Sequence, residues 1–152
     1  MWQDAQNAYL ENRILSAEPL ELVGLMYQAA TTAVREARQH LADGDIAARS
    51  RSISKACEIL IELGSSLDHA RGGEISQRLA ALYDYLVGRL IEANLQQADA
   101  PLAEVLGLLA TLAEAWDGVR AQTAPASPAA NAWAQPMAQE PVENYSSHQW
   151  SL

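Results

Sequence analysis

The feature that most constrains the fold is a seven-residue repeat between residues 46 and 67. Seven residues make about two turns of an α-helix, so the repeat aligns its members along one helical face. A small residue lies four positions after each of the first three large ones, a pattern that favours close packing against a neighbouring helix. The large residues are Ile46, Ile53, Leu60 and Leu67, and the small ones are Ser50, Cys57 and Gly64. The segment is therefore predicted to be one helix of a bundle.

Three further segments carry apolar residues at spacings of three and four, and each has start and stop signals. Pro19 opens the first, because proline is tolerated in the first helical turn, and residues 43–45, Asp-Gly-Asp, end it. The break at residues 68–73 precedes a third helix that we expect to open near Gly73, and residues 96–101 form a turn before the fourth. The expected core rows are Val23, Met26, Ala30, Val34, Ala37 and Leu41; Ile75, Leu79, Leu82, Leu86, Leu90 and Ala93; and Leu102, Val105, Leu109, Leu112, Trp116 and Val119.

The connections between these helices are short, so consecutive helices are expected to pack antiparallel. The sequence thus predicts an all-α fold, an antiparallel up-and-down four-helix bundle spanning residues 16–121. A short N-terminal helical segment, residues 1–15, precedes the bundle. Residues 122–152 are rich in Ala, Pro, Ser and Gln without a period, so we interpret them as a disordered tail.

Charge and composition exclude several classes of function. The formal net charge is −9, from 10 basic and 19 acidic residues, which disfavours a nucleic-acid partner and an anionic membrane surface. A basic cluster is interpreted as a helix end and a solvated face; it comprises Arg35, Arg38, Arg49, Arg51 and Lys55. The start of the chain lacks a signal-peptide pattern, and no segment reaches the roughly 18 apolar residues of a membrane span. We therefore expect a cytoplasmic protein without membrane insertion.

No catalytic or metal-binding constellation is recognisable. A di-iron site in a bundle needs Glu-x-x-His pairs, but none of the three histidines has a glutamate three residues before it. A phosphotransfer histidine lies mid-helix, followed at the third and fourth positions by lysine and glycine, whereas His69 lies at a helix end and precedes Gly72 and Gly73 at those positions. Cys57, the single cysteine, excludes an internal disulfide and has no adjacent base. We therefore predict a non-enzymatic protein with no cofactor and no metal.

Two helices carry more apolar surface than one core row requires. At about 100° per residue, Ile59 and Ile61 point to opposite flanks of the core row, and Leu63 widens the same face. On the third helix, Tyr83 and Val87 lie beside the core row. Taken singly, each residue is as consistent with the border of a core as with a binding surface. As a set they indicate a contiguous apolar patch, and hence a groove that binds a partner.

The N-terminal segment carries apolar residues of its own. Trp2 and Tyr9 share a helical face, and Ile14 and Leu15 follow. A helix this short is marginal in water by itself, so the segment needs a surface on which to lie. The apolar patch of the bundle supplies one, and we predict that Trp2, Tyr9, Ile14 and Leu15 cover the groove when no partner is bound.

Motifs distributed in order along residues 9–120 carry a family resemblance. Residues 67–75 read Leu-Asp-His-Ala-Arg-Gly-Gly-Glu-Ile, and residues 82–85, Leu-Tyr-Asp-Tyr, are followed by Arg-Leu-Ile-Glu-Ala-Asn-Leu at residues 89–95. The set is completed by Tyr9, Ile14, Pro19, Leu22, Met26, Tyr27, Ala115 and Trp116. Together these motifs resemble those of the bacterial flagellin secretion chaperones, the FliS family.

The resemblance implies an antiparallel helical bundle whose groove binds the disordered C-terminal region of newly made flagellin. It further implies that binding prevents premature polymerisation of flagellin, and that the chaperone delivers this cargo to the flagellar type III export apparatus. The N-terminal segment would cover the groove. Two positions depart from the family pattern, since Glu18 stands where serine is usual and Gln28 where aspartate is common. Both departures concern local capping or contacts and leave the expected fold unchanged.

One alternative from another class stays open. A helical dimerisation or regulatory module would use the same apolar face to pair with a second copy of itself. Self-association of this kind is compatible with the sequence when cargo is absent. Chromatography with and without flagellin distinguishes the two.

Overall fold

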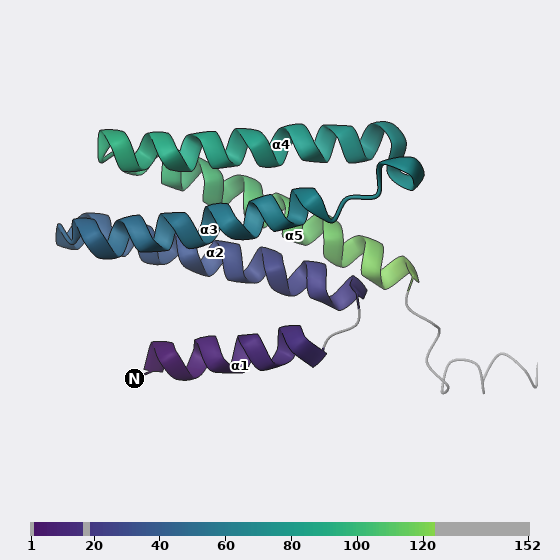
Figure 1. Cartoon of the computed structure of the whole chain (residues 1–152), viewed down its shortest axis with the longest axis horizontal. Helices are drawn as coiled ribbons and strands as arrows, with labels where there is room; N and C mark the ends of the chain where they lie inside the picture. Colours follow the sequence, from purple (N-terminus) through teal and green to yellow (C-terminus); the bar gives the residue numbers. More distant parts are fainter. Residues whose placement is uncertain (1, 17–18, 124–152) are drawn as a thin grey trace, which may run out of the picture. The chain divides into compact units, whose positions relative to one another are not determined.

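The computed structural model describes residues 2–16 and 19–123, and the side chains of residues 2–9 and 19–122. These residues form five helices and no strand, in the order α1 (Trp2–Ser16), α2 (Pro19–Asp43), α3 (Ile46–Ser65), α4 (His69–Gln96) and α5 (Asp99–Thr123) (Figure 1). The all-α prediction is confirmed, because a short N-terminal helix precedes four long packed helices. The predicted disordered tail lies outside the described residues from residue 124 onward.

Consecutive long helices run in opposite directions, and contacts at both ends of α2 secure this arrangement (Figure 1). Near the end of α2, Arg38 donates two hydrogen bonds of 2.7 and 2.8 Å to Asp99, the first residue of α5. These bonds hold the pKa of the Asp99 carboxyl below its usual value. At the opposite end, the Trp116 Nε1–H donates to the Leu20 carbonyl over 3.0 Å. Helices α2 and α5 are thus fastened to each other at both ends.

The turn between α2 and α3 forms as the sequence predicts. Gly44 adopts a left-handed conformation with φ of +73°, which glycine tolerates because it lacks a Cβ. Asp45 caps α3, since its Oδ1 accepts a hydrogen bond of 3.0 Å from the Ala48 amide. Helix α2 also begins at Pro19, as predicted.

Helix α4 begins one turn earlier than predicted, at His69 instead of near Gly73. Asp68 supplies the reason, because its Oδ1 accepts hydrogen bonds of 3.1 Å from the amides of Ala70 and Arg71 and so stabilises a first turn. Gly73 then interrupts the helical geometry with φ of 51° and ψ of −125°, a backbone conformation that favours glycine. The predicted start therefore marks a kink inside α4.

The core follows the predicted rows through the middle of each long helix. Ile53 and Leu60 of the seven-residue repeat are 3% and 0% exposed, which confirms the row on which the fold prediction was based. The buried apolar core consists of Tyr27, Ala30, Ala33, Val34, Ala37, Ile53, Ala56, Leu60, Leu63, Tyr83, Leu86, Leu90, Ala93, Leu102, Val105 and Leu109. All four long helices therefore contribute to one core.

Three of the described residues predicted for the core are exposed instead, and each lies near a helix end or a break. Ile46, the first residue of α3, is 57% exposed. Ile75 is 71% exposed because the kink at Gly73 places it out of phase with the rest of α4. Val119 is 44% exposed because it lies about one turn beyond Trp116, which already contacts the start of α2.

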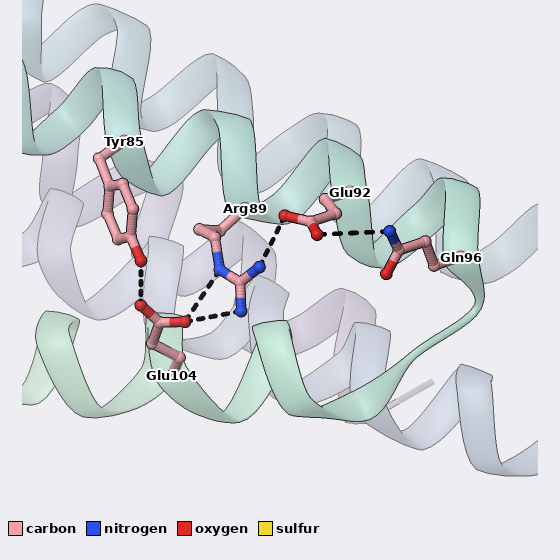
Figure 2. Close-up of polar contacts among 5 residues, drawn as sticks. All are labelled: Tyr85, Arg89, Glu92, Gln96 and Glu104. Atoms are coloured by element: carbon pink, nitrogen blue, oxygen red, sulfur yellow. Dashed lines mark hydrogen bonds and ion pairs between the residues drawn. The ribbon is translucent and has the colours of Figure 1, made fainter.

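A polar network on the surface joins α4 to α5 (Figure 2). The Tyr85 hydroxyl donates to Oε1 of Glu104, and Oε2 of the same carboxylate accepts from Arg89 Nε at 2.9 Å. Arg89 also donates to Glu92 at 2.6 Å, and Gln96 donates to Glu92 at 3.3 Å. The hydrogen bonds from Tyr85 and Arg89 hold the pKa of Glu104 below its usual value. The network fixes the position of α5 along α4.

Arg49 ties the start of α3 to the end of α4 and is only 4% exposed. Its Nε donates to Asn94 Oδ1 at 3.0 Å and a terminal nitrogen donates to the Asn94 carbonyl at 3.4 Å, while the Ser50 hydroxyl donates to the same Oδ1 at 3.2 Å. Carbonyls in the last turn of a helix lack partners within the helix, and Arg49 supplies one. The basic cluster is therefore only partly a solvated face: Arg51 and Lys55 are exposed, whereas Arg49 is structural.

Candidate functional site

A groove with a volume of about 630 Å³ runs between α2 and α3 and reaches α1; we call it the α2–α3 groove. Helix α1 contributes Asn7, helix α2 contributes Pro19, Leu22, Val23, Met26, Ala29 and Thr32, and helix α3 contributes Lys55, Glu58, Ile59 and Glu62, while Ser66 directly follows α3. The α2 side of the groove is mainly apolar, and the α3 side is mainly charged. The groove thus has two chemically different walls.

The apolar wall comes from a face of α2 beside its core row. Leu22, Met26 and Ala29 follow one another at spacings of four and three, which aligns them along the helix. These side chains are half-buried, as are those of Val23 and Ile59, so they remain partly accessible to a partner. Val23, Met26 and Ile59 also pack against the core, which holds the wall in position. An apolar strip between two helices is the surface on which an amphipathic helix packs.

Helix α1 lies along α2 and brings a polar residue to the groove. Gln3 Nε2 donates a hydrogen bond to Glu36 Oε1 of α2, and Asn7, about one turn further along α1, lines the groove. Among residues 2–9, Asn7 is the one side chain that is half-buried. The contact between α1 and the bundle is therefore polar where its side chains are described.

Two predicted anchors of the N-terminal segment do not lie in the groove. Trp2 and Tyr9 are 84% and 61% exposed. At about 100° per residue, the face of α1 that contacts α2 lies roughly a third of a turn from the face that carries these two aromatics. A contact made by the first face therefore turns the second toward solvent. The other two predicted residues, Ile14 and Leu15, belong to α1, but their side chains lie outside the described part of the chain.

The five residues predicted to line the groove occupy different environments. Ile59 lines the groove, Ile61 is 58% exposed outside its lining, and Val87 is half-buried on α4 against the core. Leu63 and Tyr83 are buried core residues, 2% and 3% exposed. Both residues were expected to line the groove, but they are absent from its lining and belong to the core instead. Helix α3 packs against both α2 and α4, so its buried face is wider than one row and includes Leu63.

Tyr83 is accommodated in the core by a second tyrosine. The Tyr27 and Tyr83 hydroxyl oxygens are 2.5 Å apart, and the ring centroids are 6.4 Å apart. A buried hydroxyl costs free energy unless it is paired, and this hydrogen bond pairs both. Burial raises the pKa of each tyrosine. Gly64, a small residue of the seven-residue pattern, lies beside the Tyr83 ring, and a Cβ there would make an ordinary van der Waals contact, 3.8 Å from Cδ2.

Sequence reasoning missed most of the apolar wall of the groove. It assigned Val23 and Met26 to the core and did not assign Leu22 or Ala29 to a binding surface. The signal was present, because Leu22, Met26 and Ala29 form a second apolar line at helical spacing. Packing against one neighbouring helix requires only a limited apolar arc. When the apolar arc is wider than that, part of it remains available to a partner.

The described residues offer no site for metal-dependent or thiol chemistry. Within residues 2–9 and 19–122, no group of three or more His, Cys, Asp or Glu side chains could hold a metal ion. Cys57 is half-buried, and burial, followed by the nearby charge of Glu58, raises the pKa of its thiol, which is the opposite of activation. In the part of the chain that the structure describes, no helix is long and apolar enough to cross a membrane.

Proteins that bind amphipathic helical segments do so in an apolar groove, and the groove along α2 and α3 is of this kind. Comparison with known families defines the class further, because residues 1–123 match the family described as flagellar protein FliS. The chain therefore belongs to the FliS family of flagellar secretion chaperones. This confirms the family indicated by the sequence motifs. It also confirms the prediction of a non-enzymatic protein, because members of the family are chaperones.

Similar proteins occur in several bacteria. The flagellar secretion chaperone FliS of Salmonella typhimurium is 40% identical over 108 residues, which cover 70% of this chain and 80% of that protein. The chaperone FliSB of Pseudomonas aeruginosa is 33% identical over 114 residues, covering 75% of this chain and 90% of that protein. FliS of Bacillus subtilis is 32% identical over 114 residues, covering 75% and 84%.

Proposed function

We propose that this flagellar secretion chaperone binds the disordered C-terminal region of flagellin in the bacterial cytoplasm, through the α2–α3 groove. The observation that carries the proposal is the apolar wall of the groove, formed by the half-buried side chains of Leu22, Met26 and Ala29 next to Ile59. Such a wall fits the apolar face of a segment that folds into an amphipathic helix on binding.

Binding in this groove accounts for both parts of a secretion chaperone's task. A flagellin segment whose apolar face is buried against α2 cannot use the same residues to pack into a filament. Premature polymerisation is therefore prevented by competition alone. The bound flagellin is then delivered to the flagellar type III export apparatus.

Helix α1 covers part of the groove in the free chaperone and gives way when flagellin binds. Its described contacts with the groove region are the hydrogen bond from Gln3 to Glu36 and the position of Asn7, while Trp2 and Tyr9 are exposed. A hydrogen bond of this kind contributes about 0.5–1.5 kcal/mol. A cargo segment that fills the groove with apolar side chains gains more, at about 25 cal/mol for each Å² of apolar surface removed from water.

Calorimetric titration with the isolated flagellin C-terminal segment tests the site. Ala29→Arg places a long charged side chain on the apolar wall, and we expect an affinity loss of at least tenfold, about 1.4 kcal/mol, with an unchanged melting temperature. Ala81→Arg is the matched control, because Ala81 is exposed on α4 outside the groove, and this variant should bind like the wild type. Equal affinities of the two variants would exclude the groove as the binding site.

Self-association is the function from another class that the same apolar wall supports. Size-exclusion chromatography of the free chain, with and without the flagellin segment, separates the two functions. A chaperone elutes as a one-to-one complex with flagellin. A dimer that flagellin does not dissociate would instead assign the groove to pairing between two copies.

A further inference from the structure

The α3 wall of the groove carries its charges in a fixed order. Arg51 and Lys55 come first, and Glu58 and Glu62 follow toward the end of α3. Spacings of four, three and four place them on one face of the helix, and all four residues are exposed. Lys55, Glu58 and Glu62 line the groove, and Arg51 extends its cationic end. The wall is therefore positive at one end and negative at the other.

These charges are available to a partner. Within residues 2–9 and 19–122, none of the four side chains takes part in an ion pair or a side-chain hydrogen bond, whereas Arg38 and Arg89 pair with acidic residues. The facing wall on α2 carries no charged residue. A segment lying in the groove thus meets apolar side chains on one side and an ordered row of charges on the other.

We propose that this row of charges selects the direction in which the flagellin segment lies. A helix is stabilised by acidic residues in its first turn and basic residues in its last, because they complement the partial charges of the helix ends. Such a helix matches the wall when its start lies beside Arg51 and Lys55 and its end lies beside Glu58 and Glu62. The cargo is then an amphipathic helix with an acidic start and a basic end, running parallel to α3. This inference rests on the proposed binding of flagellin in the groove.

Helix α1 already runs along the groove in this direction. Gln3, near the start of α1, contacts Glu36 in the second half of α2, and α1 ends at Ser16, shortly before α2 begins at Pro19. Helix α1 is therefore antiparallel to α2, and so it is parallel to α3 (Figure 1). Its first turn carries Asp4, an acidic residue of the kind that the proposal places at the cationic end of the groove.

The size of the preference follows from the geometry. Lys55 and Glu62 are seven residues apart, about 10 Å along a helix, which is comparable to the screening length of about 8 Å at physiological ionic strength. The two ends of the wall therefore act on different parts of the cargo. Each exposed ion pair changes the ratio of the two binding directions by a factor of about two to three. Pairs with the three charges that line the groove, Lys55, Glu58 and Glu62, therefore favour the parallel direction roughly tenfold.

Paramagnetic NMR with a synthetic peptide tests the direction. The probe is an amphipathic peptide of about 18 residues, five helical turns, with glutamates in its first turn, lysines in its last turn and a nitroxide on its N-terminus. In the wild-type chaperone, broadening of amide resonances should be strongest around Lys55. The variant with Arg51→Glu, Lys55→Glu, Glu58→Lys and Glu62→Lys keeps the net charge. In this variant the strongest broadening should move toward Ser66.

The controls distinguish failure of this inference from failure of the proposed function. Broadening that stays near Lys55 after the exchange, or that is equal at both ends in the wild type, overturns the inference. In about 1 M salt, where the screening length falls to about 3 Å, the tenfold preference should shrink toward one. A further outcome is that Ala29→Arg abolishes flagellin binding while the strongest broadening stays in place in the charge-exchanged variant. That result keeps the groove as the binding site and refutes the proposed direction. If neither flagellin nor the peptide binds the wild-type chain, both proposals fall.

Discussion

Removing one hydroxyl from the Tyr27–Tyr83 pair should destabilise the bundle, whereas removing both should restore most of the lost stability. The two oxygens are 2.5 Å apart, and each tyrosine is 3% exposed. In Tyr83→Phe, the Tyr27 hydroxyl stays buried without its partner, which costs about 1–3 kcal/mol, and the same holds for Tyr27→Phe. The double variant leaves no unpaired hydroxyl, so its free energy of unfolding should return to within about 1 kcal/mol of the wild type.

Urea unfolding followed by circular dichroism gives the four free energies of this cycle. At about 4 °C per kcal/mol, each single variant should also melt about 4–12 °C below the wild type. Tyr85→Phe is the control on the same helix, because Tyr85 is 47% exposed and its removal should change the free energy of unfolding by less than about 0.5 kcal/mol. Single variants as stable as the wild type would refute the argument. So would a double variant whose loss equals the sum of the single losses.

Four further predictions concern the core, the helices, the acid limit of stability and the tail. Leu60→Ala should lower the free energy of unfolding in urea by about 2–5 kcal/mol, because Leu60 is 0% exposed. Ile61→Ala, at a residue 58% exposed, should lower it by less than about 0.5 kcal/mol. Equal losses would contradict the core assignment. Gly107→Ala should stabilise the bundle by about 1 kcal/mol, since no atom lies within 4 Å of the added Cβ, and a lower melting temperature would count against this. The pKa of Glu104 is lowered in the folded state, so its contribution is present above its unfolded pKa and is lost as the pH falls through its folded pKa. Glu104→Gln should therefore flatten the decline of melting temperature in acid, and an unchanged slope would exclude the effect. Deleting residues 124–152, which lack a periodic apolar face, should leave the melting temperature within a few degrees and the flagellin affinity unchanged; a larger drop would show that this segment supports the fold.

Helix boundaries could be predicted where the signal acts within a single turn. Pro19, Gly44 and Asp45 each determine the conformation of the residues next to them, and the structure has all three as expected. The start of α4 was misplaced because two local signals lie five residues apart. Asp68 caps a first turn and Gly73 kinks the chain, and the sequence alone does not show that a helix forms on both sides of the glycine.

The binding surface was harder to predict, because it depends on which helices face one another. Helical periodicity gives the direction of a side chain but not the residue that meets it. Helical periodicity places Tyr83 beside the core row, yet its partner Tyr27, which lies 56 residues earlier in the chain, pairs its hydroxyl and makes burial favourable. The same reason explains why the apolar wall of the groove was not predicted from the sequence. Leu22 and Ala29 were recognisable as apolar positions of α2, but their accessibility follows from how far α3 covers that helix.

The attachment of α2 to α5 at both of its ends determines where the entropy of binding is lost. Arg38 holds Asp99 at one end, and Trp116 holds the Leu20 carbonyl at the other, so the apolar wall exists before any cargo arrives. A preformed surface loses little conformational freedom when it is occupied, so in the proposed binding mode the ordering cost falls on the incoming segment. In the proposed binding mode the bundle is therefore a template, which imposes a helical shape on a flexible segment without being reshaped itself.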